Sequence, residues 1–249
     1  MGVREDRVPE GARRIGEHPR LELGVLAMHH GSQLLDPRPY RERIERQLGL
    51  LTQIRSAGIA SITALDIGGG LGIRYRDEAP LSPEQLAEVI TPLLGPTGLR
   101  ILLEPGRYLV GSAGVLLTSV LYRKHSGGKE FMIVDAGMND LVRPSHYQAY
   151  HEIVELEERG RPESTVDVVG PVCETGDFLA LGRSLPGLVA GERLALLGAG
   201  AYGFVMSSNY NSRGRAAEVL VDGARWATVR PRETAEELYR SEIAAPFPL

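Results

Sequence analysis

Lysine and cysteine are scarce in this sequence. Lys124 and Lys129 are its two lysines, and Cys173 is its single cysteine. One thiol excludes an internal disulfide and fits a reducing cytoplasm. No apolar run approaches the ~20 residues that span a membrane, and the charged start lacks the apolar core of a signal peptide. A net charge of −4 argues against nucleic acid or an anionic membrane as the main partner.

A run of three glycines follows a strand-like segment. Residues Ile62–Ile67 form a short apolar run that is typical of a buried strand, and Gly68–Gly70 come directly after it. Glycines there let the backbone turn sharply, and their bare N–H groups are a common phosphate site. The spacing is not that of a dinucleotide-binding loop, because Ile73 stands where another glycine is required. By itself the run fits either a phosphate cradle or a tight structural turn.

The first 114 residues alternate between helix-like and strand-like patterns. With 43% hydrophobic residues, the 249-residue chain can form one large domain or two smaller ones. Helices are predicted at residues 4–18, at Pro39–Ala57 and from Pro83 onward, and strands at Leu21–His29, Ile62–Ile67 and Leu99–Glu104. Strand–helix–strand order predicts parallel strands with right-handed crossovers, and therefore an α/β unit.

Polar and glycine residues gather where each of the three predicted strands ends. They are His29, Ser32 and Gln33 after the first strand, Gly68–Gly70 after the second, and Glu104 and Arg107 after the third. In parallel α/β folds, ligands bind at the carboxyl ends of the strands. We therefore expect a ligand site at this rim.

After residue 114 the pattern changes to short strand-like runs separated by glycine, proline and charged residues. The runs are Val115–Arg123, Phe131–Val134, Ile153–Leu156, Val166–Val169, Leu194–Leu197, Ala217–Val221 and Trp226–Val229, followed by a helical segment at Thr234–Arg240. They predict an antiparallel β domain over residues 115–249 with a short terminal helix, so the fold class is α/β plus all-β. The acidic residues between Asp135 and Asp140 lack the spacing of a calcium loop, and no metal site is predicted.

Several candidate residues also have ordinary structural explanations. Cys173 fits a small core residue as well as a reactive thiol on a loop. The Glu104–Arg107 segment fits a plain turn with a salt-bridging arginine, and His29 fits a hydrogen-bonded histidine at a strand end. Four further histidines are interpreted as surface or structural residues, namely His18, His125, His146 and His151.

Six motifs together resemble those of the diaminopimelate decarboxylases, which are pyridoxal-phosphate enzymes with an alanine-racemase-like fold. They are His29-His30-Gly31-Ser32-Gln33, Asp66-Ile67-Gly68-Gly69-Gly70-Leu71-Gly72, Glu104-Pro105-Gly106-Arg107, Val134-Asp135-Ala136-Gly137-Met138-Asn139-Asp140, Gly170-Pro171-Val172-Cys173-Glu174-Thr175-Gly176-Asp177, and Gly200-Ala201-Tyr202-Gly203 with Met206, Ser208, Tyr210 and Asn211. They occur in the family's order over essentially the whole chain. The resemblance implies that residues 1–114 form part of a (β/α)8, or TIM-like, barrel. It also implies decarboxylation of meso-2,6-diaminopimelate to L-lysine.

The resemblance further implies roles for individual residues. Those expected to bind the cofactor, pyridoxal 5′-phosphate, are Ser32, Gly68, Gly69, Gly70, Glu104, Pro105, Gly106, Arg107 and Tyr202. Those expected to bind substrate are Arg107, Arg143 and Tyr147 on carboxylates, Glu174 at the distal amino group, and Tyr202. Two are expected to be catalytic, namely His29 against the cofactor ring and Cys173 as the proton donor after carbon dioxide leaves. In this family Cys173 and Glu174 would reach the partner's site, which implies a homodimer.

The sequence departs from the family in its lysines. The family's cofactor-binding lysine lies in an early barrel strand, within a Tyr-Ala-x-Lys-Ala-Asn-like motif that does not occur in this sequence. Lys124 and Lys129 flank a predicted hairpin tip at Ser126-Gly127-Gly128 and do not fit that role. Because a whole barrel takes ~250 residues, the chain is expected to correspond to the C-terminal portion of the enzyme. It would then pair with a second copy, a full-length chain or a chain carrying the N-terminal half.

Two other functions are compatible with the same residues. The chain can be a non-catalytic fragment or dimerising subunit that lacks the cofactor-binding lysine. It can also belong to a decarboxylase of a related diamino acid, such as D-ornithine or D-lysine. The set of Glu174, Arg143 and Tyr147 favours diaminopimelate, because a second carboxylate needs an anchor of its own.

Overall fold

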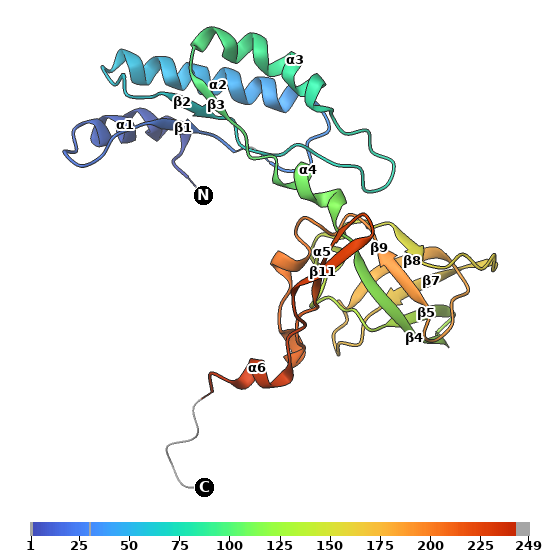
Figure 1. Cartoon of the computed structure of the whole chain (residues 1–249). Coiled ribbons are helices and arrows are strands. Elements are labelled where there is room, and N and C mark those ends of the chain that lie inside the picture. The colour runs from blue at the N-terminus through green and yellow to red at the C-terminus, as the bar shows by residue number, and fades with distance from the viewer. Residues whose placement is uncertain (1, 30, 243–249) are drawn as a thin grey trace, which may run out of the picture. The chain divides into compact units, whose positions relative to one another are not determined.

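The computed structural model describes residues 2–29 and 31–242, so His30 of the first motif lies outside the described residues. The chain divides into two compact units, Met1–Leu109 and Val110–Leu249, which are described separately (Figure 1). The boundary predicted after residue 114 falls a few residues later in the chain, just before the strand that begins at Leu116. Within the described residues, no helix has both the length and the apolar character to cross a membrane.

The first unit contains a three-stranded parallel sheet in the order β1-β2-β3, as the strand–helix–strand pattern predicts. Its strands are β1 (Val25–Ala27), β2 (Ala64–Asp66) and β3 (Arg100–Leu102). Its helices are α1 (Val8–Gly16), α2 (Arg38–Ser56), α3 (Pro83–Leu94) and α4 (Gly106–Val110), the last reaching the boundary between the units, and its 3-10 turns are Glu5–Arg7 and Gly95–Thr97. Each strand is shorter than the run that predicted it, since the runs extend into flanking loop residues, among them the buried Ile62 and Ile67.

Helix α2 provides most of the helical side of the core in this unit. Its residues Ile44 and Ile54 are fully buried, as are Leu65 and Ile67 on and after β2. Helices α2 and α3 lie side by side on one face of the sheet (Figure 1). This packing fixes the carboxyl ends of the strands, where the predicted rim residues lie.

The second unit is built on a six-stranded sheet in the order β6-β9-β4-β5-β7-β8. Its strands are β4 (Leu116–Ser126), β5 (Lys129–Val134), β6 (Ile153–Glu155), β7 (Glu163–Val169), β8 (Phe178–Pro186) and β9 (Arg193–Leu196). The prediction of a purely antiparallel domain is wrong, because β5 and β7 pair in parallel while the other neighbours pair antiparallel. The long connection between β5 and β7 carries the chain back to the starting end of β5, which permits the parallel pairing.

Two elements of this unit were not predicted. Strand β8 contains Gly182, whose φ is 58°, and it ends at Pro186. These two residues interrupt the apolar pattern by which the sequence would have indicated a strand. Helix α5 (Arg143–Tyr147) is a single short turn, too brief to give helical periodicity. The predicted hairpin tip is confirmed between β4 and β5, where Gly127 and Gly128 both have positive φ. The remaining elements are the 3-10 turns Gly111–Ala113, Phe204–Met206 and Tyr210–Ser212, the antiparallel pair β10 (Glu218–Asp222) and β11 (Arg225–Arg230), and the predicted terminal helix α6 (Ala235–Tyr239).

Candidate active site

The glycine loop after β2 packs against the loops that follow β1 and β3. A Cβ on Gly69 would lie 2.2 Å from the carbonyl oxygen of Glu104, and one on Gly68 would lie 2.7 Å from that of Met28. The N–H of Gly68 donates to Asp66 Oδ1 (2.8 Å), and the N–H of Glu104 donates to the carbonyl of Gly68 (3.0 Å). The three glycines are therefore required sterically, because the neighbouring backbone leaves no room for side chains.

Hydrogen bonds join the three loops of this rim. Gln33 Nε2 donates to the carbonyl of Ile73 (2.6 Å), and the N–H of Ile73 donates back to Gln33 Oε1 (3.2 Å). The Arg107 guanidinium donates to the Tyr75 hydroxyl from Nη1 and to Ser32 Oγ from Nη2, the latter at 3.0 Å. Ser32 and Gln33 follow β1, Ile73 and Tyr75 follow β2, and Arg107 follows β3. The rim residues predicted from the sequence are thus held together by side chains of all three loops.

In the second unit, the predicted carboxylate anchor Arg143 is buried on α5 and contacts His151. Arg143 Nη1 lies 2.9 Å from His151 Nε2, and His151 Nδ1 lies 2.8 Å from the carbonyl oxygen of Leu197. A carbonyl can only accept, so Nδ1 carries the proton and Nε2 accepts from the arginine. His151 is fully buried, in keeping with a structural role, but sequence reasoning missed its contact with Arg143. Its one sequence signal is a histidine soon after the arginine, which does not indicate a contact.

We expect this contact to matter for stability. His151→Phe fills the same space but leaves the Arg143 donor without its acceptor, which should lower the free energy of unfolding by about 1–3 kcal/mol. His151→Gln keeps an acceptor in place of Nε2 and should cost less. Urea unfolding of both variants checks this. Equal losses in the two variants would show that the acceptor does not matter.

The buried side chain of Asp177 holds the loop that carries Cys173 and Glu174 by hydrogen bonds to the backbone. Asp177 Oδ2 accepts from the N–H of Val172 and Oδ1 from the N–H of Met138, both at 2.6 Å. The loop 170–177 is therefore tied to the loop that follows β5. Cys173 itself is exposed.

Glu174 is held as an ionised carboxylate. Its Oε1 accepts from the N–H of Gly176 (3.2 Å) and the hydroxyl of Thr175 (3.0 Å), and its Oε2 accepts from the Tyr210 hydroxyl (3.4 Å). These bonds, led by that from Gly176, lower the pKa of Glu174 below its ordinary value. A Cβ on Gly176 would lie 2.9 Å from Ser145 Oγ, so the loop adjoins α5, the helix of Arg143 and Tyr147.

The structure places the predicted site residues in two groups, one in each unit. The first unit brings together His29, Ser32, Gly68–Gly70, Glu104 and Arg107. The second brings together Cys173, Glu174 and the helix of Arg143 and Tyr147. Tyr202 lies in the second unit in the left-handed region, with a φ of 59°, and is 41% exposed.

Comparison with known proteins identifies the family. The family model described as "Pyridoxal-dependent decarboxylase, C-terminal sheet domain" matches residues 33–200. The chain belongs to the pyridoxal-dependent decarboxylases.

Within that family, curated relatives of the chain include diaminopimelate decarboxylases. That of Pseudomonas aeruginosa is 49% identical over 246 residues, which are 99% of this chain and 59% of the relative. That of Aquifex aeolicus is 51% identical over 225 residues, or 90% of this chain and 53% of the relative. The chain thus spans somewhat more than half the length of these relatives.

Solved structures agree with this assignment. A crystal structure from Aquifex aeolicus has a TM-score of 0.93 and 45% identity, and the match covers 96% of this chain and 60% of that one. Diaminopimelate decarboxylase from Helicobacter pylori complexed with L-lysine has a TM-score of 0.90 and 38% identity, over 96% of this chain and 59% of that one. The fold of the chain is that of the matched parts of these two structures.

Proposed function

We propose that this chain provides the C-terminal portion of an enzyme that decarboxylates meso-2,6-diaminopimelate to L-lysine in the cytoplasm. The observation that carries the proposal is the name shared by its curated relatives, which match nearly the whole chain. The ionised Glu174 beside the helix of Arg143 and Tyr147 supports a substrate with a distal amino group and a second carboxylate. In this proposal residues 1–114 are part of a TIM-like barrel, and residues 115–249 are the C-terminal β domain.

The rim of the first unit fits the phosphate group of pyridoxal phosphate. Among the described residues, the N–H groups of Gly69 and Gly70 meet no hydrogen-bond acceptor. With the hydroxyl of Ser32 and the guanidinium of Arg107, they form a donor set suited to a dianion. The turn at Pro105 and Gly106 would complete this side of the cofactor site. Tyr202 would contact both cofactor and substrate.

The remaining residues would bind the substrate and control protons. When bound, pyridoxal phosphate supplies an electron sink for the charge left on the α-carbon as carbon dioxide departs. Glu104 would keep the ring nitrogen protonated, and His29 would lie against the ring. Arg107 and Arg143, with Tyr147, would bind carboxylates, and Glu174 would bind the distal ammonium group. Cys173 would donate a proton to the α-carbon, because a thiol carries an S–H proton that it can transfer as a general acid.

A second polypeptide segment is needed for this chemistry in our proposal. Lys124 lies on β4, and Lys129 Nζ forms an ion pair with Asp167 (3.0 Å), so both lysines belong to the β4–β5 hairpin of the second unit. Among the described residues, β1 and β3 each pair with β2 alone, which leaves two open sheet edges. We propose that a second segment pairs with these edges and brings the cofactor-binding lysine. This segment would correspond to the part of the relatives that the chain does not match. The functional assembly is proposed to be a dimer.

A chimera tests the proposed function. The part of the Pseudomonas aeruginosa relative that this chain does not match would be joined to the chain, and release of carbon dioxide from meso-diaminopimelate would be measured with added pyridoxal phosphate. We expect steady release by the chimera and none by the chain alone, because the chain lacks the family's lysine motif. D-ornithine and D-lysine serve as comparison substrates.

Each outcome decides between the functions considered. Release from D-ornithine or D-lysine in preference to diaminopimelate would assign the chain to a different diamino-acid decarboxylase. A folded chimera that binds the cofactor and releases nothing would indicate a non-catalytic subunit. Release by the chain alone would show that Lys124, Lys129 or freely exchanging cofactor supports the reaction.

A further inference from the structure

A buried arginine lies close to the glycine loop. Arg43, on the sheet-facing side of α2, is 1% exposed. None of its three guanidinium nitrogens meets the geometry of a hydrogen bond with a residue that the structure describes, although the Tyr40 hydroxyl lies near enough to favour the charge. Arginine stays protonated in proteins, so this is a buried charge. Such a charge is costly unless something compensates it.

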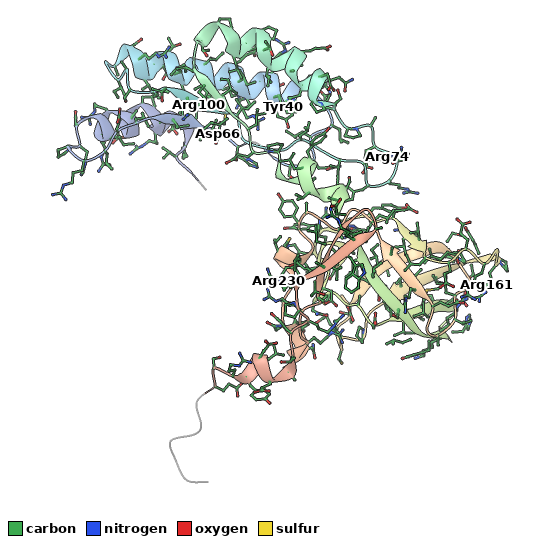
Figure 2. All side chains as sticks on the ribbon, in the orientation of Figure 1. Tyr40, Asp66, Arg74, Arg100, Arg161 and Arg230 are labelled. Atoms are coloured by element: carbon green, nitrogen blue, oxygen red, sulfur yellow. The ribbon has the colours of Figure 1, made fainter. Side chains whose placement is uncertain are left out.

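The neighbours of Arg43 connect it to the glycine loop. Its guanidinium carbon lies 4.6 Å from the centre of the Tyr40 ring, and the Tyr40 hydroxyl donates to the carbonyl of Gly69 (3.4 Å). Asp66 attracts the guanidinium and accepts the N–H of Gly68 at Oδ1 (2.8 Å). Figure 2 labels Tyr40 on α2 and Asp66 at the end of β2. Arg43 therefore contacts or attracts the two side chains that hold the glycine loop.

Burial opposes the charge on Arg43 in the structure as it stands. Desolvation lowers the pKa of Arg43, and the attraction of Tyr40 and Asp66 only partly offsets it. Burial also raises the pKa of Tyr40, which keeps its hydroxyl protonated and able to donate to Gly69. An anion bound at the glycine loop would attract the guanidinium. It would thereby offset the cost of burying the charge of Arg43, which Tyr40 and Asp66 offset only in part.

We propose that Arg43 is a positioning residue for the phosphate group at the glycine loop: it provides a fixed positive charge behind the loop and attracts Asp66, the side chain that accepts from the N–H of Gly68. This inference rests on the proposed cofactor site and adds to it a residue outside the rim. Arg43 acts through Tyr40 and Asp66 and through its charge, without touching the reacting atoms.

Substitution of Arg43 in the full chain tests the proposal. Arg43→Met removes the charge and keeps most of the volume, and Arg43→Gln removes the charge but keeps a polar group if the methionine variant does not fold. Calorimetric titration would give the dissociation constants of inorganic phosphate, pyridoxal phosphate and pyridoxal, and thermal unfolding would give Tm. We expect phosphate and pyridoxal phosphate to bind on the order of tenfold more weakly, pyridoxal to be unaffected, and Tm to stay unchanged or rise. Arg46→Met, an exposed position on the same helix, is the matched control and should change none of these values.

The outcomes separate this role from the proposed function. Phosphate binding equal to that of the unaltered chain, with or without a change in Tm, would overturn the role of Arg43 and leave the cofactor site intact. Equal weakening of pyridoxal would also overturn it, because a charge effect requires the phosphate. Failure of the unaltered chain to bind either phosphate or pyridoxal phosphate would overturn the cofactor site, and the role of Arg43 with it.

Discussion

Gly69→Ala is expected to unfold or severely destabilise the first unit. The new Cβ would lie 2.2 Å from the Glu104 carbonyl oxygen, which belongs to the backbone and cannot swing aside. Relief requires moving the loop after β3 away from the loop after β2. We expect a loss of about 3 kcal/mol in the free energy of unfolding, a large part of the ~5–15 kcal/mol typical of a domain. Urea unfolding followed by far-ultraviolet circular dichroism reports mainly on this unit, because the long helices α2 and α3 lie in it.

Gly49→Ala is the matched control for this experiment. Gly49 lies on the exposed side of α2, where a Cβ would meet nothing within 4 Å. The same change should therefore stabilise the unit by about 0.5–1 kcal/mol, since alanine favours the helix more than glycine does. The two variants have opposite expected signs. An unchanged unfolding curve for Gly69→Ala would show that the loops are not packed as described.

Cys173→Ala is expected to abolish most of the turnover of the chimera. If Cys173 donates the proton after carbon dioxide leaves, its loss should lower kcat by about 10²–10⁴-fold, the usual contribution of a general acid. The main chain of its loop is held by Asp177 through Val172 and Met138. Binding of diaminopimelate should therefore change little. Steady-state release of carbon dioxide gives kcat, and titration with L-lysine reports binding.

Two further variants make this test specific. Cys173→Ser keeps a small polar group with a much weaker acid and should remain impaired. Ser126→Ala, at the exposed tip of the β4–β5 hairpin, should behave like the unaltered chimera. Full activity in Cys173→Ala would assign the proton to another group. A parallel loss of L-lysine binding would indicate instead that Cys173 is structural.

The rim of the first unit could be predicted because its signals are local. A triple glycine at the end of a strand and a Glu-Pro-Gly-Arg turn each mark a loop by themselves, and the strand–helix order places these loops at one edge. Which side chains join the loops could not be predicted. The bond between Gln33 and Ile73 links residues that are 40 positions apart, and that between Arg107 and Ser32 spans 75 positions.

The second unit shows the same limit more strongly. Its short runs predicted strands but not their partners, and the parallel pairing of β5 with β7 depends on where the long connection returns the chain. His151 has no local signal for its contact with Arg143, because the ring is held by the carbonyl of Leu197, which is 46 positions further along the chain.

The sequence alone determined the class of fold, the rim, the family resemblance and the missing lysine motif, because these depend on residue type and on spacing along the chain. Only the tertiary structure decided which buried polar groups have partners. His151 accepts from Arg143, whereas Arg43 has no such acceptor among the described residues. On the sequence neither arginine carries a signal of its burial or of its neighbours in space. Burial and the position of acceptors on other elements distinguish them, and those are properties of the packed chain.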